Sequence, residues 1–174
     1  SKGTNAIGTA LTDRRATLVH GGEHFLSVNR FLTCSCAPIS DPHGNVIGAL
    51  DVSGSQESYH AHTMALVRMS TQMIENHLFV DWFDEALRVH FHARPEFLGT
   101  LVEGIAAFSE DGRLLAVNSS GAFQLGLHSE ELATHSLSSL FGVGVGVLLE
   151  RCRASSPGLL RLDLRSGVAV AARA

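Results

Sequence analysis

The sequence LTCSCAPISDPHGNVIGALDVSG fills residues 32–54 and holds the clearest local pattern of the chain. Residues 31–39 are apolar or small and carry no charge, as is typical of a buried strand. The turn-forming sequence DPHGN follows at residues 41–45, and residues 46–53 then return as a second strand. The stretch therefore predicts an antiparallel hairpin.

Two short elements are expected before this hairpin. Residues 4–12 combine good helix formers with a Thr or an Asn that is able to cap the amino end, which predicts a short helix. A β-branched run follows at residues 16–20, and Gly21 and Gly22 end it. The first part of the chain is therefore expected to combine helix and strand.

A long helix is expected after the hairpin. Residues 60–90 contain no proline, and their polar interruptions fall at helical spacing, which indicates one helix of about 30 residues. We expect it to end near Arg94, because the residue before a proline is disfavoured in helical conformation. Such a helix is a natural connector between two domains.

The second half of the chain predicts another set of strands and short helices. Strands are expected at residues 104–109 and 114–118, joined by an acidic turn with glycine. A final strand is expected beyond Ala174, so that the sheet would be left with an edge that needs cover or a partner. The other expected elements are short helices at residues 96–103, 122–127, 129–133 and 147–153, and a hairpin formed by residues 159–164 and 168–172.

Composition limits the class of protein. The 174 residues are 45% hydrophobic, which is enough to build a core, and only 17% charged with a net charge of −4. This balance offers no electropositive surface for nucleic acid.

We also expect a soluble, cytoplasmic chain without contact to a membrane, because no apolar run approaches 18 residues and the polar start resembles no signal peptide. The odd number of cysteines, Cys34, Cys36 and Cys152, suits a reducing compartment.

Several stretches resemble a known family. GTNAIGTAL at residues 3–11, VHGGEHFLSVN at residues 19–29, the hairpin itself and HTMALVRMSTQMIENHLF at residues 62–79 resemble the carboxy-terminal part of the GAF domain in sigma-54-dependent activators of the acetoin-catabolism-regulator type. GIAAFSEDGRLLAVNSSGAFQLGLHSEEL at residues 104–132 resembles the start of a PAS domain. The order of the two stretches is also that of such activators.

The resemblance implies an α+β chain of tandem GAF-like and PAS-like domains, with antiparallel sheets flanked by helices and joined by a long helix. It implies a partial GAF-like domain over residues 1–79, a helical linker over residues 80–95 and a PAS-like domain over residues 96–174. The chain would then be a sensory region without catalysis, which binds a small effector such as acetoin or a partner. The full-length activator would carry an ATPase domain and would bind DNA and sigma-54 RNA polymerase.

An effector pocket is expected between the hairpin and the loop of residues 20–29, because that loop gathers polar side chains beside apolar Phe25 and Leu26. In the second half, Asn118 stands at a strand end, where it would contact a ligand or cap the next helix. A second, apolar cavity is expected between Ile105, Ala107, Leu115, Val117, Phe123 and Leu127. The candidate ligand-binding residues are His20, Glu23, His24, Asn29, Cys34 and Asn118.

Catalytic and metal chemistry find little support in the sequence. Cys34 and Cys36 lie two apart in a strand and face the same side, as a redox pair or as two small buried side chains. The ten histidines match no metal-ligand frame, and no haem ligand or flavin-reactive cysteine motif is present, so no cofactor is expected. Two alternatives remain open: a GAF-type methionine sulfoxide reductase that uses Cys34 or Cys36, and the input region of a sensor kinase or cyclic-dinucleotide enzyme.

A heptad pattern on the long helix predicts a parallel homodimer. Polar Asn76 and His90 interrupt the pattern and would fix its register. The alternative is that these apolar residues are buried within one subunit. The candidate dimer-interface residues are Leu66, Met69, Met73, Val80, Phe83 and Leu87.

Overall fold

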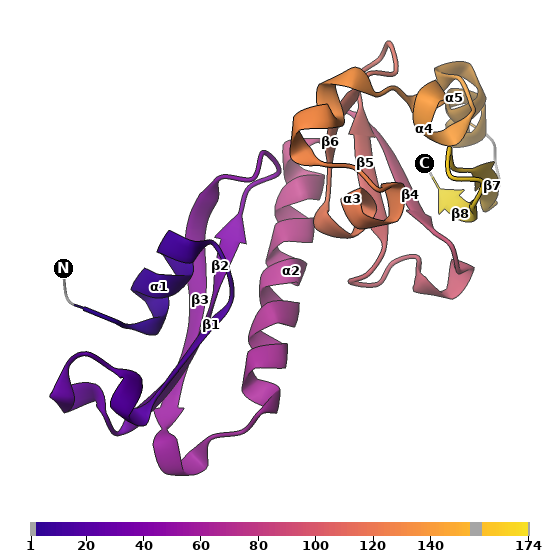
Figure 1. The fold of residues 1–174 in the computed structure, drawn as a ribbon. Helices are drawn as coiled ribbons and strands as arrows, with labels where there is room; N and C mark the ends of the chain where they lie inside the picture. The colour runs from indigo at the N-terminus through magenta and orange to yellow at the C-terminus, as the bar shows by residue number, and fades with distance from the viewer. Residues whose placement is uncertain (1–2, 154–157, 174) are drawn as a thin grey trace. The chain divides into compact units, whose positions relative to one another are not determined.

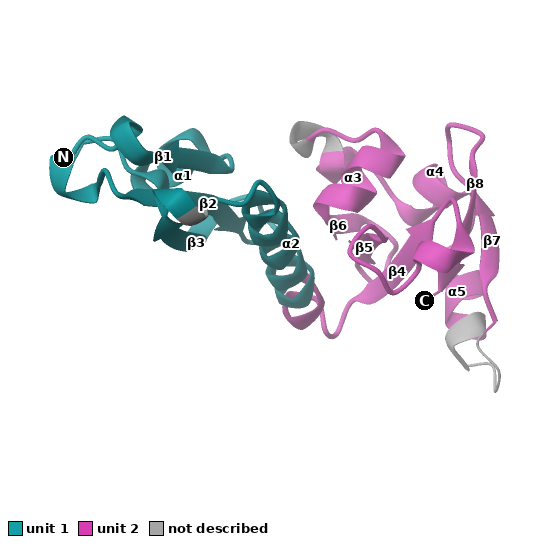
Figure 2. Cartoon of the chain, turned by 90° about the horizontal axis from the view of Figure 1, so that it is seen from below, with its two compact units in different colours: residues 1–78 teal, residues 79–174 magenta. Residues whose placement is uncertain are grey.

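The computed structural model describes residues 3–153 and 158–173 of the chain (Figure 1). The chain divides into two compact units, Ser1–Leu78 and Phe79–Ala174 (Figure 2). Each unit combines an antiparallel sheet with helices. The expected mixture of antiparallel sheet and helix is therefore confirmed.

The first unit contains a three-stranded antiparallel sheet in the order β1-β2-β3. Its strands are β1 (Thr17–His20), β2 (Leu32–Ser40) and β3 (Val46–Ser55). The predicted hairpin is confirmed as β2 and β3. Asp41 holds the turn, because one of its carboxylate oxygens accepts from the backbone N–H groups of His43 and Asn45 at 2.9 Å each. Gly44 supplies the left-handed conformation of this turn, with a φ of 82°.

Helices lie on both faces of this sheet (Figure 1). Helix α1 (Ala6–Asp13) starts at the cap residue Asn5, as predicted, and its buried Ala6 and Ala10 pack against buried residues of β1 and β2. Helix α2 (His62–Trp82) runs beside the other face, where the Glu75 carboxylate accepts from the backbone N–H of Ser40 at 2.7 Å. Burial raises the pKa of Glu75, and the hydrogen bond from Ser40 opposes that shift. The short helices of this unit are η1 (Gly21–Glu23), η2 (Ser27–Asn29) and η3 (Gln56–Ser58).

Helix α2 is shorter than the sequence predicted. It ends at Trp82, and β4 (Leu87–His92) follows, so the expectation of a helix to residue 90 and of a helical linker over residues 80–95 is wrong beyond Trp82. In β4, Leu87, Val89 and Phe91 alternate with polar residues, and Val89 and Phe91 are fully buried. This period of two indicates a strand.

The second unit contains a five-stranded antiparallel sheet in the order β6-β5-β4-β8-β7. Strand β8 pairs with both β4 and β7, so the edges of this sheet are β6 and β7. The predicted strands at residues 104–109 and 114–118 and the final hairpin are confirmed. In place of a helix over residues 96–103 there is only the short η4 (Pro95–Phe97). The remaining elements are β5 (Gly104–Phe108), β6 (Leu114–Val117), α3 (Ser119–Leu125), η5 (Ser129–Thr134), α4 (Leu137–Phe141), α5 (Val145–Arg153), β7 (Leu160–Asp163) and β8 (Ala169–Arg173).

A hydrogen-bonded carboxylate ties β4 to the loop before β5. Glu103 is buried, and its two oxygens contact His90 Nδ1 at 3.1 Å and the backbone N–H of Gly99 at 2.7 Å. Burial alone would raise the pKa of Glu103, but these hydrogen bonds and the nearby charges of His90 and Arg173 outweigh it, and the pKa is lowered. His90, expected on a helix, is therefore part of the sheet.

The sheet of the second unit buries residues on both of its faces. The larger cluster contains Phe91, Phe108 and Phe141, and the smaller one joins Phe79 to Ile105 and to two alanines of β5 and β6. The apolar cavity predicted between six residues of this half is wrong, because Phe123 is 88% exposed and Leu115 is also exposed. The sequence placed Leu115 on the correct strand, but it predicted a buried side chain where the structure has an exposed one.

Candidate functional site

The first unit contains a cavity of about 310 Å³ between the start of α1, the loop before β2, and strands β2 and β3. Its volume lies at the lower end of the range of small-molecule sites, which begins at about 300 Å³. We call it the first-unit cavity. Its lining residues are Thr4, Asn5, Ala6, Ile7, His24, Leu26, Asn29, Leu32, Cys34, Asp51 and Ser53.

Backbone and cap interactions fix the outer wall of this cavity. The Asn5 side chain caps α1, since its Oδ1 accepts from the backbone N–H of Gly8 at 2.8 Å. Its Nδ2 donates to the carbonyl oxygen of Gly3 at 3.0 Å. The backbone N–H of Phe25 donates to the carbonyl oxygen of Thr4 at 3.2 Å, so the loop that carries His24 is tied to the start of α1.

The strand register assembles the inner wall. Cys34 lies opposite Ser53, and Cys36 lies opposite Asp51, so all four side chains share one face of the sheet. Ser53 Oγ lies 2.7 Å from Asp51 Oδ2 and 3.0 Å from Cys34 Sγ. A hydroxyl has a single hydrogen, and a carboxylate is the stronger acceptor, so Ser53 donates to Asp51. The second oxygen, Asp51 Oδ1, is buried and has no hydrogen-bond partner among the described residues.

His24 is the most buried polar residue of the cavity wall, with only 3% of its surface exposed. Its Nδ1 lies 3.0 Å from the carbonyl oxygen of Gly21. Its Nε2 is buried and, within residues 3–153 and 158–173, has no hydrogen-bond partner. An unpaired buried polar atom of this kind costs about 1–3 kcal/mol.

Cys36 is not among the residues that line the cavity. Burial, together with the nearby Asp51 and Cys34, raises the pKa of the Cys36 thiol to about 11. The thiolate is the reactive form of cysteine, so we expect the Cys36 thiol to react slowly near neutral pH.

The structure separates the candidate ligand-binding residues into two groups. His24, Asn29 and Cys34 line the first-unit cavity. Glu23 instead accepts from the backbone N–H of His20 at 2.7 Å and caps η1, while His20 Nδ1 lies 2.6 Å from the hydroxyl of Thr33. Neither His20 nor Glu23 lines the cavity: His20, at the end of β1, pairs with β2, and Glu23 belongs to the local structure of the loop.

Asn118, the remaining candidate, forms hydrogen bonds to α3, to β5 and to the residue before β5. Its Oδ1 accepts from the backbone N–H groups of Gly121 at 2.8 Å and Ile105 at 2.9 Å. Its Nδ2 donates to the carbonyl oxygen of Glu103 at 3.0 Å. Of the two roles considered for Asn118, the structure shows that of a helix cap, for α3.

Sequence reasoning missed Asp51, Ser53 and the start of α1. The signal was present in the sequence VIGALDVS, where a charged residue and a hydroxyl occupy alternate positions of an otherwise apolar strand. Residues two apart in a strand lie on the same face, so this pair is expected to meet.

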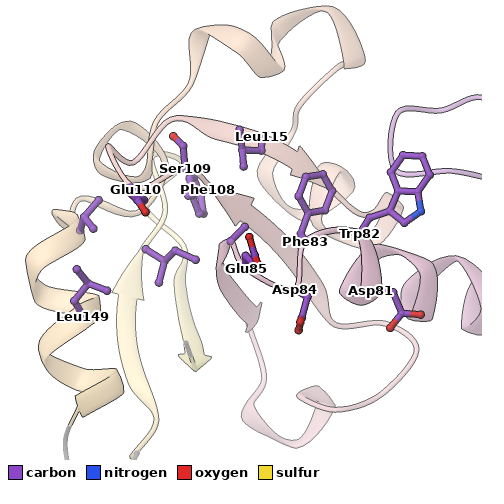
Figure 3. Close-up of a pocket in the computed structure, with 13 residues that line it drawn as sticks. Asp81, Trp82, Phe83, Asp84, Glu85, Phe108, Ser109, Glu110, Leu115 and Leu149 are labelled. Atoms are coloured by element: carbon purple, nitrogen blue, oxygen red, sulfur yellow. The ribbon is translucent and has the colours of Figure 1, made fainter.

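The second unit contains a larger groove of about 1060 Å³ (Figure 3). Leu149 of α5 lies on one side of this groove, and Phe83 and Trp82 lie on the other. Its lining residues include four acidic ones, Asp81, Asp84, Glu85 and Glu110, and none of those shown is basic. All four acidic residues are exposed to solvent, and none carries one of the buried unpartnered atoms found among the described residues. The groove is therefore a weaker candidate for a small-molecule site than the first-unit cavity.

The predicted dimer residues fall into three environments. Leu66, Met69 and Met73 of α2 are exposed by 63%, 53% and 51%. Val80 and Phe83 pack against the cluster around Phe79 in the second unit. Leu87 lies in β4 and packs against the larger core of that unit. The heptad seam drawn on one continuous helix is therefore wrong for Phe83 and Leu87, which lie beyond the end of α2.

No helix among the described residues is long and apolar enough to cross a membrane. In the same part of the chain, no group of three or more His, Cys, Asp or Glu residues is arranged to hold a metal ion.

Residues 1–78 match the family model of the GAF domain, so the first unit of the chain belongs to the GAF domain family. The chain is also similar to transcriptional regulators. It is 33% identical over 132 residues to a signal-transduction and transcriptional-control protein of Clostridium beijerinckii, with 76% of this chain and 21% of that protein covered.

Two other relatives are regulators of acetoin metabolism. The chain is 35% identical over 125 residues to the acetoin catabolism regulatory protein of Cupriavidus necator, which covers 67% of this chain and 18% of that protein. It is 33% identical over 76 residues to the acetoin dehydrogenase operon transcriptional activator AcoR of Bacillus subtilis, with 44% of this chain and 13% of that protein covered. The chain thus spans about a fifth, or less, of the length of these relatives.

Proposed function

We propose that this chain is the signal-sensing region of a bacterial transcriptional activator, and that its GAF domain binds a small effector in the first-unit cavity. The observation that carries this proposal is a cavity of about 310 Å³ whose wall combines apolar side chains with the polar residues His24, Asn29 and Asp51. Small-molecule sites combine mostly apolar walls with a few placed polar groups. Leu26, Leu32 and Ile7 supply apolar wall here.

In this proposal the second unit is a PAS domain. The succession of β5, an acidic turn with glycine, β6 ending before Asn118, and then short helices supports this assignment. The similarity to the Clostridium beijerinckii protein supports it as well, because a match of 132 residues is longer than the GAF match and extends into the second unit. Helix α2 would carry a change in the GAF domain toward this unit.

The remaining parts of the proposal concern the whole protein. We place the full-length activator in the cytoplasm, with an ATPase domain and a DNA-binding domain that act with sigma-54 RNA polymerase. Acetoin is the first effector to test, because two of the relatives are named for the control of acetoin metabolism. The chain itself would have no catalytic activity, in keeping with the regulatory names of its relatives.

Isothermal titration of the chain with acetoin (3-hydroxybutan-2-one) and with its reduced form, butane-2,3-diol, tests the effector proposal. We expect binding of at least one compound and a loss of affinity of about tenfold or more in His24→Ala, because one hydrogen bond in a buried site is lost. Asn29→Ala, which changes a less buried lining residue, should weaken binding in the same direction.

The matched control is His60→Ala, because His60 is exposed and does not line the cavity. Its affinity should equal that of the parent. Equal affinities in the parent, His24→Ala and Asn29→Ala would show that the effector binds elsewhere.

We further propose a homodimer through the exposed stripe of α2 formed by Leu66, Met69 and Met73. Three large apolar side chains on one exposed helix face support it. Met73→Glu should convert a dimeric parent to a monomer in light scattering at tens of micromolar. Arg68→Glu introduces the same side chain on another face of α2 and should leave the dimer intact. A monomeric parent, or a Met73→Glu protein that stays dimeric, would contradict the proposal.

A further inference from the structure

The large groove of the second unit lies wholly within that unit, and we call it the second-unit groove. Its volume of about 1060 Å³ lies just above the range of about 300–1,000 Å³ that is typical of small-molecule sites. The groove therefore has room for part of a macromolecule. Its lining residues are 81–87, Phe108, Ser109, Glu110, Leu115, Val145 and Leu149.

Large apolar side chains of this groove are exposed to solvent. Trp82 is 52% exposed, and Leu115 and Leu149 are exposed as well. Figure 3 shows Leu149 of α5 on one side of the groove and Trp82 on the other. Single exposed apolar residues are normal, but several that line one groove beside charged residues are typical of an interaction site.

The second-unit groove also carries negative charge, and none of its described lining residues is basic. Arg88 offsets one of the acidic residues from outside the lining, because its guanidinium lies 3.7 Å from the Asp84 carboxylate. Within the described part of the chain, the other three carboxylates form no salt bridge. The groove therefore favours a positively charged occupant. Its exposed acidic lining residues are Asp81, Asp84, Glu85 and Glu110.

From the exposed apolar lining and the acidic residues beside it, we infer that the second-unit groove binds a partner protein through an amphipathic helix rich in lysine and arginine. The apolar face of that helix covers Trp82, Leu115 and Leu149, and its basic side chains lie beside Glu85 and Glu110. This interaction goes beyond effector binding in the GAF domain and does not depend on it.

The chemistry of the groove disfavours other occupants. Nucleic acid and anionic membranes carry the same sign of charge as the groove and are repelled by it. The lining consists of side chains from β4, β5, β6 and α5 and from the segment before β4. A helix satisfies its own backbone hydrogen bonds, so contacts between side chains are sufficient to bind it.

The test uses three synthetic peptides of about 18 residues, which is long enough to form a helix. The first has leucine on one face and lysine on the other, the second has glutamate in place of lysine, and the third has serine in place of leucine. None contains tryptophan, so the fluorescence of Trp82, the single tryptophan of the chain, reports occupation of the groove. We expect the leucine–lysine peptide to bind at least about tenfold tighter than either of the others, and more weakly in about 0.5 M salt than in about 0.05 M salt.

Charge reversal locates the binding site on the chain. Glu85→Lys combined with Glu110→Lys should weaken binding of the leucine–lysine peptide about tenfold and strengthen binding of the leucine–glutamate peptide. The matched control combines Glu96→Lys with Asp163→Lys, which makes the same change of net charge at exposed residues of this unit that do not line the groove. The control should bind the leucine–lysine peptide within about twofold of the parent.

Three results would overturn the inference: equal affinity of the parent for the leucine–lysine and leucine–glutamate peptides, an equal loss of affinity in the control, or no binding at peptide concentrations up to about 0.1 mM. Light scattering tests a second copy of the chain as the occupant. Self-association of the parent that is lost in the groove variant and kept in the control would overturn the assignment to a separate partner. The comparison of the three peptides on the parent decides the question even where the groove variant does not fold.

Discussion

Phe141→Ala is expected to destabilise the second unit by about 3–5 kcal/mol, the usual cost of removing a buried phenylalanine ring. Phe141 is 1% exposed and belongs to the larger core of this unit. Its ring lies 5.0 Å from that of Phe91 and 6.2 Å from that of Phe108, both in edge-on geometry. The substitution therefore removes buried area and two aromatic pairs at once.

Urea unfolding followed by tryptophan fluorescence measures this effect, because Trp82 is the single tryptophan of the chain and lies in the second unit. Phe123→Ala is the matched control, since it makes the same chemical change at a residue that is 88% exposed. Its free energy of unfolding should stay within about 0.5 kcal/mol of the parent. A large loss in Phe123→Ala, or none in Phe141→Ala, would contradict the packing described for this unit.

The sequence predicted the hairpins well because local chemistry determines them. The turn that joins β2 to β3 depends on the Asp41 side chain and on the positive φ of Gly44, and both are visible as the sequence DPHGN. The turn between β7 and β8 similarly contains Gly167 with a φ of 81°. Such turns form from a few adjacent residues, so a single sequence is enough to find them.

The end of the long helix could not be found in the same way. Residues after Trp82 continue with apolar side chains, and the prediction took the next proline as the stop. Strand β4 is stabilised by pairing with β5 and β8, which are distant in sequence. Long-range pairing of this kind overrides local helix propensity. In the sequence, the strand was indicated only by the alternation of apolar Leu87, Val89 and Phe91 with polar residues.

The candidate site was predicted in part for a related reason. The polar loop residues were visible, but their partners were not, because the pairing of Cys34 with Ser53 depends on the register of two strands. Local hydrogen bonds also compete for the same residue types, which is why Glu23 serves as a cap. The sequence therefore predicted the loop residues of the first-unit cavity, whereas Asp51 became visible as a lining residue only from the register of β2 and β3.

The thiol of Cys36 is expected to react about 200-fold more slowly in the folded chain at pH 8 than an ordinary cysteine does. With a pKa of about 11, about one thiol in a thousand is ionised at this pH, whereas an ordinary thiol with a pKa of about 8.5 is ionised to about a quarter. The residue is also fully buried, which slows the reaction further. A methionine sulfoxide reductase needs a reactive thiolate, so the enzyme alternative predicts the opposite behaviour of this residue.

Iodoacetamide labelling of a Cys34→Ser, Cys152→Ser chain, followed by mass spectrometry, isolates Cys36 as the remaining cysteine. The same chain unfolded in urea is the control, because its thiol is exposed and should have an ordinary pKa. We expect the folded rate to be at least about 100-fold lower than the unfolded rate, and no turnover of free methionine sulfoxide by the parent or by Cys34→Ser. Equal labelling rates, or turnover that Cys34→Ser abolishes, would favour an enzyme over a sensory domain, because a reductase needs an accessible thiolate and the structure gives Cys36 a buried thiol with a raised pKa.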